Sequence, residues 1–261
     1  MLRKLFLSAA VAFLLTPALL AQTVDEIIAK NIEARGGLDK IKAVQSMRSS
    51  GKMEFGPGME APGVMIQKRP SYVRLDFTVQ GLTATQAYDG KSGWAIMPFT
   101  GKKDPEAMSA DDTKDFEDEA DLDGPLVDYK SKGHQVELLG KEKVEGTDAY
   151  KVKLTRKNGD VDIIYVDADS FLEIKEEQTR TIRGTERESE TTLGDYREVN
   201  GLMFPFAVAS SIKGSPQQQK LTIEKIELNL PLDDASFKMP AAAPVLADKP
   251  DAAKPADKPK N

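Results

Sequence analysis

Apolar and polar residues alternate with a period of two over much of the chain, most clearly between residues 72 and 79. There Val73, Leu75 and Phe77 occupy every second position, with polar residues between them. Because successive side chains of a β-strand point to opposite faces, this pattern predicts a strand with one buried face.

Two further strands are expected directly after this one. The segment 83–88 alternates weakly, the Asp-Gly turn of 89–93 follows it, and 94–99 is apolar on both faces. We therefore expect residues 68–99, which begin at the turn Lys68-Arg69-Pro70, to form a three-stranded antiparallel meander.

Similar short segments continue toward the C-terminus, each bounded by turn residues. Strands are expected at 135–139, 149–155, 161–166, 171–177, 202–206 and 221–230. The polar segment 178–193 suits only a long solvated hairpin around Gly184. In 221–230 the apolar parity changes between Ile223 and Ile226, which predicts a β-bulge near Glu224 and Lys225.

The N-terminal part of the mature sequence has a helical period instead. Val24, Ile27, Ile28 and Ile32 mark one face of a helix that ends at Arg35, with Gly36 after it. Thr23 and Glu26 have the spacing of a capping box, and 38–43 predicts a further helical turn. An amphipathic helix of this kind needs a sheet to cover.

Residues 104–123 are dominated by Asp and Glu and should form surface helix or loop. Asp104-Pro105-Glu106 predicts a helix start, and a second short helix is expected to open at Gly124. The crowded carboxylates of this segment could bind calcium, but the EF-hand spacing and its turn glycine are absent, which favours a solvated charged face. These carboxylates are Asp111, Asp112, Asp115, Glu117 and Asp118.

Both ends of the chain differ from the part between them. Arg3 and Lys4 precede a short apolar run, which predicts a signal peptide over 1–21 that is cleaved near Ala21. Residues 241–261 are rich in Ala, Pro, Lys and Asp and should be disordered. Residues 22–240 are then expected to form one domain that is exported to the periplasm.

Composition and charge exclude several functions. Removing Arg3 and Lys4 takes the net charge from −6 to −8, which disfavours nucleic acid as a partner. The chain has no cysteine, so thiol chemistry and disulfides are excluded. His134 is the only histidine, and no Gly-x-Ser-x-Gly or phosphate-binding loop occurs. We expect no enzymatic activity, no metal and no cofactor.

Large apolar residues, several of them methionines, gather in the first strands. Methionine suits adaptable apolar sites, although an ordinary core between sheet and helix would explain the same pattern. The set comprises Met53, Phe55, Met65, Leu75, Phe77, Trp94, Met97 and Phe99.

The motifs of this region resemble the periplasmic carrier that moves lipoproteins to the outer membrane, the LolA family. Lys68-Arg69-Pro70, Asp89-Gly90-Lys91 with Trp94, and Pro98-Phe99 follow one another as in that family. The closing segment around Asp234-Ala235-Ser236-Phe237 and Pro240 is also similar. The resemblance extends over about 23–240.

The resemblance implies an α+β fold, a strongly curved antiparallel half-barrel with helices on its concave face. It makes the eight apolar residues above the lining of a cavity for acyl chains of lipoproteins or lipids. It also makes Arg69 similar to the arginine that holds the helical lid of that family through carbonyl oxygens. The partners that it implies are an inner-membrane ABC transporter and an outer-membrane receptor, and we expect a monomer.

The cost of exposing an acyl chain constrains such a mechanism. Releasing a chain of about 14 carbons into water costs roughly 11 kcal/mol, at about 0.8 kcal/mol per methylene. Cargo should therefore pass between docked partners. Two alternatives remain at the level of sequence: a regulatory module that senses lipid or protein on the same fold, and a structural envelope protein with a filled core.

Overall fold

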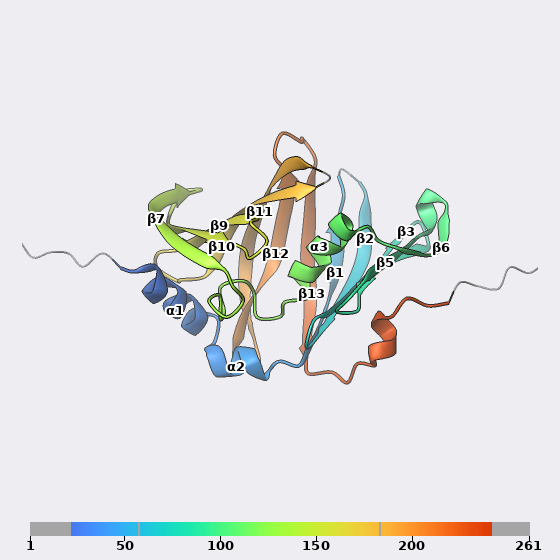
Figure 1. Ribbon diagram of the computed structural model, residues 1–261, viewed down its shortest axis with the longest axis horizontal. Coiled ribbons are helices and arrows are strands. Elements are labelled where there is room, and N and C mark those ends of the chain that lie inside the picture. The colour runs from blue at the N-terminus through green and yellow to red at the C-terminus, as the bar shows by residue number, and fades with distance from the viewer. Residues whose placement is uncertain (1–21, 57, 183, 242–261) are drawn as a thin grey trace, which may run out of the picture.

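The structure is a computed structural model that describes residues 22–56, 58–182 and 184–241. The predicted signal peptide, and the predicted tail after its first residue, lie outside the described residues. Thirteen strands form one antiparallel sheet in the order β6-β5-β4-β3-β2-β1-β13-β12-β11-β10-β9-β8-β7. The sheet is strongly curved and open, with β6 and β7 at its two edges, and the helices lie on its concave side (Figure 1). The predicted α+β half-barrel is thereby confirmed.

The helical elements are few and short. They are α1 (Val24–Ala34), α2 (Leu38–Ala43), α3 (Ala110–Glu119) and the 3₁₀ turns η1 (Pro98–Thr100) and η2 (Asp234–Phe237). The strands are β1 (Ser46–Glu54), β2 (Glu60–Lys68), β3 (Tyr72–Val79), β4 (Leu82–Tyr88), β5 (Gly93–Met97), β6 (Lys102–Ala107), β7 (Gln135–Val144), β8 (Thr147–Thr155), β9 (Val161–Asp167), β10 (Glu173–Ile182), β11 (Thr185–Val199), β12 (Leu202–Ile212) and β13 (Gln218–Leu228).

Two meanders joined side by side make this sheet. The strands β1 to β6 follow one another on one side, and β7 to β13 follow one another on the other. The first strand, β1, pairs with the last, β13, and this one long-range pairing joins the halves. The predicted meander of 68–99 corresponds to β3, β4 and β5, and the polar hairpin around Gly184 corresponds to β10 and β11.

The predicted bulge is present in β13. Ser50 of β1 pairs with Lys225, whereas the next residue, Gly51, pairs with Ile223, so Glu224 is the extra residue. This insertion explains the change of apolar parity along the strand, because it lets Ile223 and Ile226 face the same side of the sheet.

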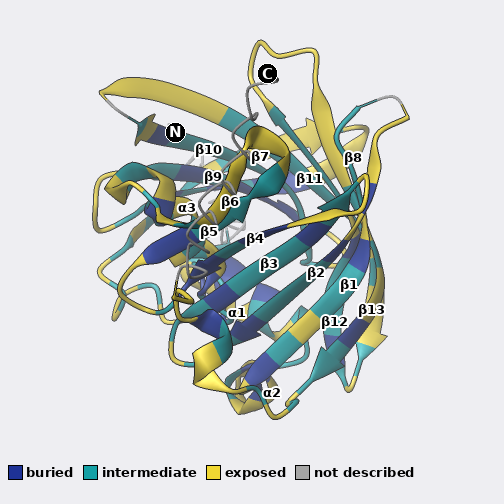
Figure 2. Ribbon diagram, turned by 90° about the vertical axis from the view of Figure 1, so that its right-hand side faces the viewer, coloured by how far each residue is buried: buried dark blue, intermediate teal, exposed yellow. Residues whose placement is uncertain are grey.

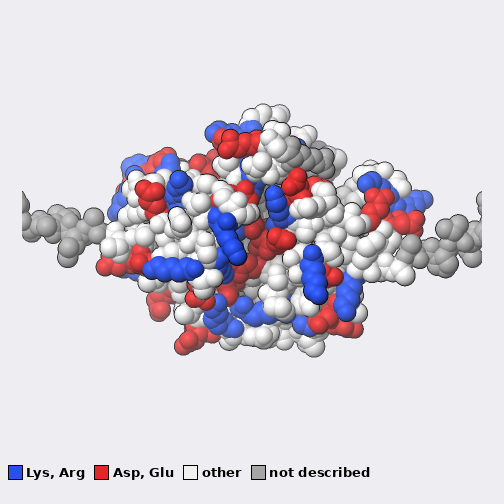
Figure 3. Space-filling model, in the orientation of Figure 1, with Lys and Arg blue, Asp and Glu red and all other residues white. Residues whose placement is uncertain are grey.

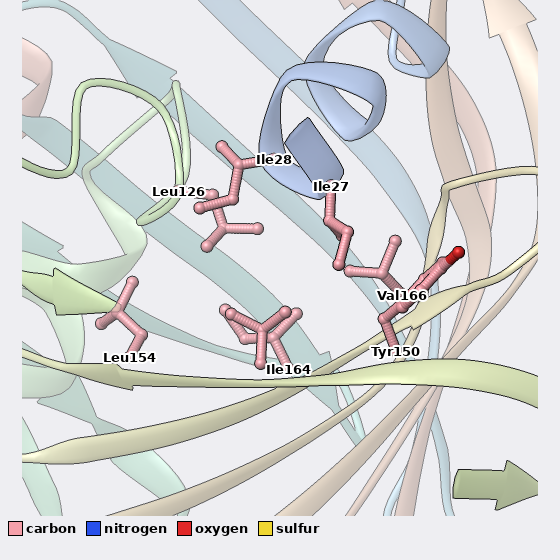
Figure 4. Packing of buried hydrophobic residues seen from close by; sticks show 8 residues of the cluster. Ile27, Ile28, Leu126, Tyr150, Leu154, Ile164 and Val166 are labelled. Carbon is pink, nitrogen blue, oxygen red and sulfur yellow. The ribbon is translucent and has the colours of Figure 1, made fainter. Parts of the chain in front are cut away.

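The N-terminal helix begins and ends where the sequence predicts. Thr23 caps α1 and Glu26 bonds back to the Thr23 backbone, which completes the capping box, and Gly36 follows the C-cap with a φ of 118°. Ile27 and Ile28 of α1 are buried against β8 and β9 together with Leu126 (Figure 4). The strand residues of this cluster are Tyr150, Val152, Leu154, Ile164 and Val166.

The helix expected to start at 104 is wrong. Residues 102–107 are the edge strand β6, which pairs with β5, and the helix begins only after Ser109, whose hydroxyl accepts from the Asp112 N–H. Pro105 is tolerated because an edge strand leaves one row of N–H groups unpaired.

The helix expected from Gly124 is also wrong. Residues 125–133 form successive turns, and Gly124, Asp128 and Gly133 all have positive φ, which a helix does not allow. Within the described residues, no helix is long and apolar enough to cross a membrane.

Candidate functional site

Cross-strand register defines which residues share the concave face. Met65 of β2 lies opposite Ser49 and Leu75, and Gly63 lies opposite Gly51 and Phe77. All three α-helices contact this face: α1 over β8 and β9, α2 over Leu202 of β12, and α3 over β3 and β4. We call this helix-covered face the groove. Figure 2 shows how buried and exposed stretches alternate along its strands.

An apolar hollow of about 50 Å³ lies in the floor of the groove, where β1, β2, β3 and β13 meet. Three of the predicted cavity residues, Met53, Met65 and Leu75, line it together with Leu221 and Ile223 of β13. Ser49, Ser50, Gly51 and Gly63 complete the lining.

Three predicted phenylalanines form a cluster beside the hollow, where Phe77 lies opposite Gly63. The ring of Phe77 lies 5.7 Å from that of Phe55 and 5.7 Å from that of Phe99. Phe77 is buried, whereas Phe99 is 40% exposed at the strand tips. Met97 precedes Phe99 on the groove side of β5, since it shares the parity of Ala95 and hence of Leu75. Apolar side chains therefore extend from the hollow to solvent.

Trp94 does not line the groove. It pairs with Ala87, one residue out of phase with the groove positions of β4 and β5, and so points to the outer face. There its Nε1 donates to the carbonyl oxygen of Phe237 at 2.8 Å. The ring of Phe237, in the closing turn η2, stacks on Tyr72. The run 94–99 is apolar on both faces because the closing segment covers the second one.

Arg69 holds the C-terminal end of α2. Its Nε donates to the carbonyl oxygen of Val44 at 2.6 Å and its Nη2 to that of Ile41 at 3.1 Å. The same guanidinium binds both carboxylate oxygens of Asp123, at 2.5 and 3.3 Å, and Lys42 contacts Asp123 as well. Four hydrogen bonds thus connect the β2–β3 turn to α2 and to the segment after α3.

The electrostatics of Asp123 agree with this arrangement. Burial raises the pKa of its carboxyl, but the hydrogen bonds from Arg69 and Lys42 lower it by more, so the pKa lies below its ordinary value. Asp123 is therefore ionised at neutral pH, and the contact to Arg69 is a charge-assisted one.

A second polar attachment holds the C-terminal end of α3 over the other half of the sheet. Asp118 of α3 accepts from Arg156 at 2.7 Å and from Arg180 at 3.1 Å. Both arginines also bind Asp162 of β9, which is fully buried. Burial raises the pKa of Asp118 against the opposing effect of the two arginines.

Sequence reasoning missed Arg156, Asp162 and Arg180, and it named Asp118 only among the carboxylates of a solvated charged face. Their only local signal is that Asp162 and Arg180 occupy positions that face the groove within their strands. Such inward charges in alternating strands need partners of opposite sign, and those partners come from α3 and from the turn after β8.

Carboxylates also lie in the recess of the groove. Figure 3 shows acidic side chains gathered near the middle of this face, with lysine and arginine side chains on either side. Glu176 of β10 lies on this side, bonded to Gln178 at 3.0 Å, and burial together with Asp162 raises its pKa to about 7. The groove is therefore apolar around the hollow of β1–β3 and β13, and polar around Asp162 of β9 and Glu176 of β10.

His134 and the acidic residues of α3 bond to neighbouring groups. The Nδ1 of His134 accepts from the Lys157 backbone N–H at 3.2 Å, and burial lowers the pKa of this histidine. Among the described residues, no three His, Asp or Glu side chains are placed to hold a metal ion. In α3, Asp111 pairs with Lys114 and Asp118 pairs with Arg156.

Solved structures share this fold. The chain is similar to a DUF1329 family protein from Desulfovibrio piger (13% identity, TM-score 0.61) and to a LolA superfamily protein from Nitrosomonas europaea (16% identity, TM-score 0.57). Each match covers 84% of this chain and 98% of the other. A putative outer membrane lipoprotein-sorting protein domain from Vibrio parahaemolyticus has 13% identity and a TM-score of 0.54, over 80% of this chain and 94% of that one.

No protein-family model matches the sequence, and no curated protein matches it. At these identities the structural likeness concerns the fold. The described chain therefore has the LolA-like fold, as the resemblance of its sequence motifs implied.

Proposed function

We propose that the protein is an exported, non-enzymatic carrier that binds acyl chains of lipoproteins or other lipids in the groove. It moves them across the periplasm toward the outer membrane. The main support is the apolar hollow of Met53, Met65, Leu75, Leu221 and Ile223, which lies on the helix-covered face of a LolA-like sheet.

The size of the hollow bears on the mechanism. A hollow of about 50 Å³ admits only part of an acyl chain. A whole acyl chain needs more room, so the helices over the groove must move when cargo binds. The structure then represents the closed state of the carrier.

Arg69 is the latch of this closed state in the proposed mechanism. Its bonds to Ile41, Val44 and Asp123 hold α2 and the segment after α3 against the β2–β3 turn. Cargo that lifts these elements must break those bonds. The closed empty state and the open loaded state therefore compete, which allows release to docked partners such as a transporter or a receptor.

Replacing the latch tests this function. Arg69→Leu removes the donors and should favour the open state by about 1–3 kcal/mol, the usual cost of losing such bonds. The variant should bind an acylated fluorescent peptide more tightly than wild type and pass it to acceptor vesicles less readily. Arg69→Lys should restore only part of the difference, because an ammonium does not reproduce the planar fork.

Arg48→Leu is the matched control. Arg48 is an exposed arginine of β1 on the outer face, 3.7 Å from Glu227, and its loss should leave binding unchanged. Titration of all four folded proteins with the same peptide gives the comparison. Equal affinity of wild type and both Arg69 variants would exclude the latch, and no binding by any of them would exclude the carrier function.

A further inference from the structure

Two glycines face each other in the floor of the groove. Gly51 of β1 and Gly63 of β2 are cross-strand partners, and both line the apolar hollow. Phe77 of β3 is the next residue in that row. Every other groove-facing position around this pair carries a side chain. The missing side chains of the two glycines therefore create the hollow in the floor of the groove.

The sheet leaves no room for a side chain at Gly51 but leaves room for one at Gly63. A Cβ added at Gly51 would lie 2.1 Å from the backbone oxygen of Thr222, because the bulge at Glu224 brings the β13 backbone over this position. A Cβ at Gly63 would instead lie 3.0 Å from Met53 Sδ and 3.3 Å from Met53 Cγ, the far end of a flexible side chain. The sheet geometry therefore explains Gly51 but does not require glycine at position 63.

We propose that the hollow above Gly51 and Gly63 receives the terminal carbons of the bound acyl chain, and that Gly63 sets the longest chain the groove accepts. We call this hollow the glycine seat. Its walls are the apolar residues Met53, Met65, Leu75, Leu221 and Ile223.

Shape and chemistry both fit the end of a saturated chain. An apolar cavity of this kind stays dry and binds apolar groups, and about 50 Å³ suits a few terminal carbons rather than a polar head group. The cluster of Phe55, Phe77 and Phe99 adjoins the seat, because Phe77 lies opposite Gly63, and Phe99 is exposed. A chain that ends in the seat and follows this cluster has its polar end outward.

Met53 makes the seat adjustable. Its thioether lies directly over Gly63, and an unbranched side chain with three rotatable bonds can swing aside at small cost. Displacement of Met53 deepens the seat for a longer chain, and a side chain at position 63 would occupy the space that Met53 vacates.

The inference rests on the proposed function, and a chain-length series tests the two separately. Saturated fatty acids of increasing length compete with a fluorescent acyl probe for the folded protein. For wild type, affinity should rise about fourfold with each added methylene until the groove is full. For Gly63→Val the rise should stop about two to three carbons earlier, because the three side-chain carbons of valine fill the space of about as many chain carbons.

Gly194→Val is the matched control. Gly194 also lies in a strand without positive φ, but it shares the outer face with Ala207, and a Cβ there would meet no atom within 4 Å. This variant should reproduce the wild-type length profile. Met53→Ala provides an independent variant, since it enlarges the seat and should extend the rise to longer chains.

The length profiles separate the glycine seat from the carrier function. An earlier limit for Gly63→Val or a later one for Met53→Ala, with Gly194→Val unchanged, supports the seat. Identical profiles for wild type and both seat variants would overturn it while leaving the carrier function standing. If wild type binds no fatty acid and no acyl probe, both the carrier function and the seat are wrong.

Discussion

Single side chains decide how tightly the covers are held. Arg69 and Asp118 act from opposite sides of the groove, and each is partly buried and bonded to more than one partner. Partial burial strengthens such contacts, because the surroundings of low dielectric screen charges less than water does. The same surroundings penalise an ionised carboxylate, and at Glu176 burial outweighs the attraction of Arg156.

The raised pKa of Glu176 should appear in the pH dependence of the unfolding free energy. Its pKa is raised by burial from 4.5 to about 7, so the folded protein holds this proton more strongly than the unfolded chain does. The contribution of protonated Glu176 to the unfolding free energy is fully present below about pH 4.5, and it is lost as pH rises through about 7. As pH rises from 5 to 8, wild type should lose about 1–3 kcal/mol of unfolding free energy that Glu176→Gln keeps.

Urea unfolding at the two pH values measures this difference. Glu198→Gln, at an exposed position of β11, should follow the wild-type pH dependence. If Glu176→Gln and wild type lose equal stability between pH 5 and pH 8, the carboxyl is not perturbed.

At the scale of elements, α3 connects the two halves of the sheet across the groove. Phe116 and Ala120 pack against Val73 and Tyr88 on one side, while Asp118 binds the arginines of the other side. The backbone oxygen of Glu119 also accepts from the Gln67 side chain. The helix is thus held by apolar contacts at one edge and by charges at the other.

Removing the charge should loosen α3 without altering the core. Asp118→Asn leaves Arg156 with Asp162, and Arg180 with Asp160 and Asp162. We expect a loss of about 1–3 kcal/mol, less than for a fully buried pair because Asp118 is 31% exposed. Amide hydrogen exchange within α3 should accelerate more than that within α1. Lys114→Gln breaks only an exposed pair with Asp111 and should cost less than about 0.5 kcal/mol. Equal exchange rates in wild type and Asp118→Asn would show that the network does not fasten the helix.

For the whole molecule, the open sheet leaves two edge strands that could pair with another chain. At one edge, β6 is short and contains Pro105 as well as Lys102 and Lys103. At the other, β7 has a register irregularity between Leu138 and Gly140. Proline, charge and bulges are the usual means by which edge strands avoid pairing.

We expect the protein to be monomeric for this reason. Light scattering should give the mass of one chain over a wide range of concentrations. Pro105→Thr restores an N–H on β6 and should increase self-association at high concentration. A wild-type dimer would show that one of these edges is an interface.

Local signals were sufficient for most of the elements. Thr23, Glu26 and Gly36 set the ends of α1 through bonds to residues three or four positions away. The parity change around Glu224 predicted a bulge that the β1–β13 register contains. The helix at 104 was predicted wrongly because Asp-Pro-Glu is also compatible with an edge strand, and pairing with β5 decided between the two.

The groove was decided by tertiary structure. Trp94 faces outward because β5 has its register fixed by β4, and the closing segment that covers it comes from more than a hundred positions later in the chain. Asp118, Arg156, Asp162 and Arg180 meet only once β8, β9 and β10 lie beside α3. The pairing of Gly51 with Gly63 likewise depends on one register. Periodicity specifies which face of a strand is apolar, but strand order and register determine which residues share that face, and these depend on contacts distant in sequence.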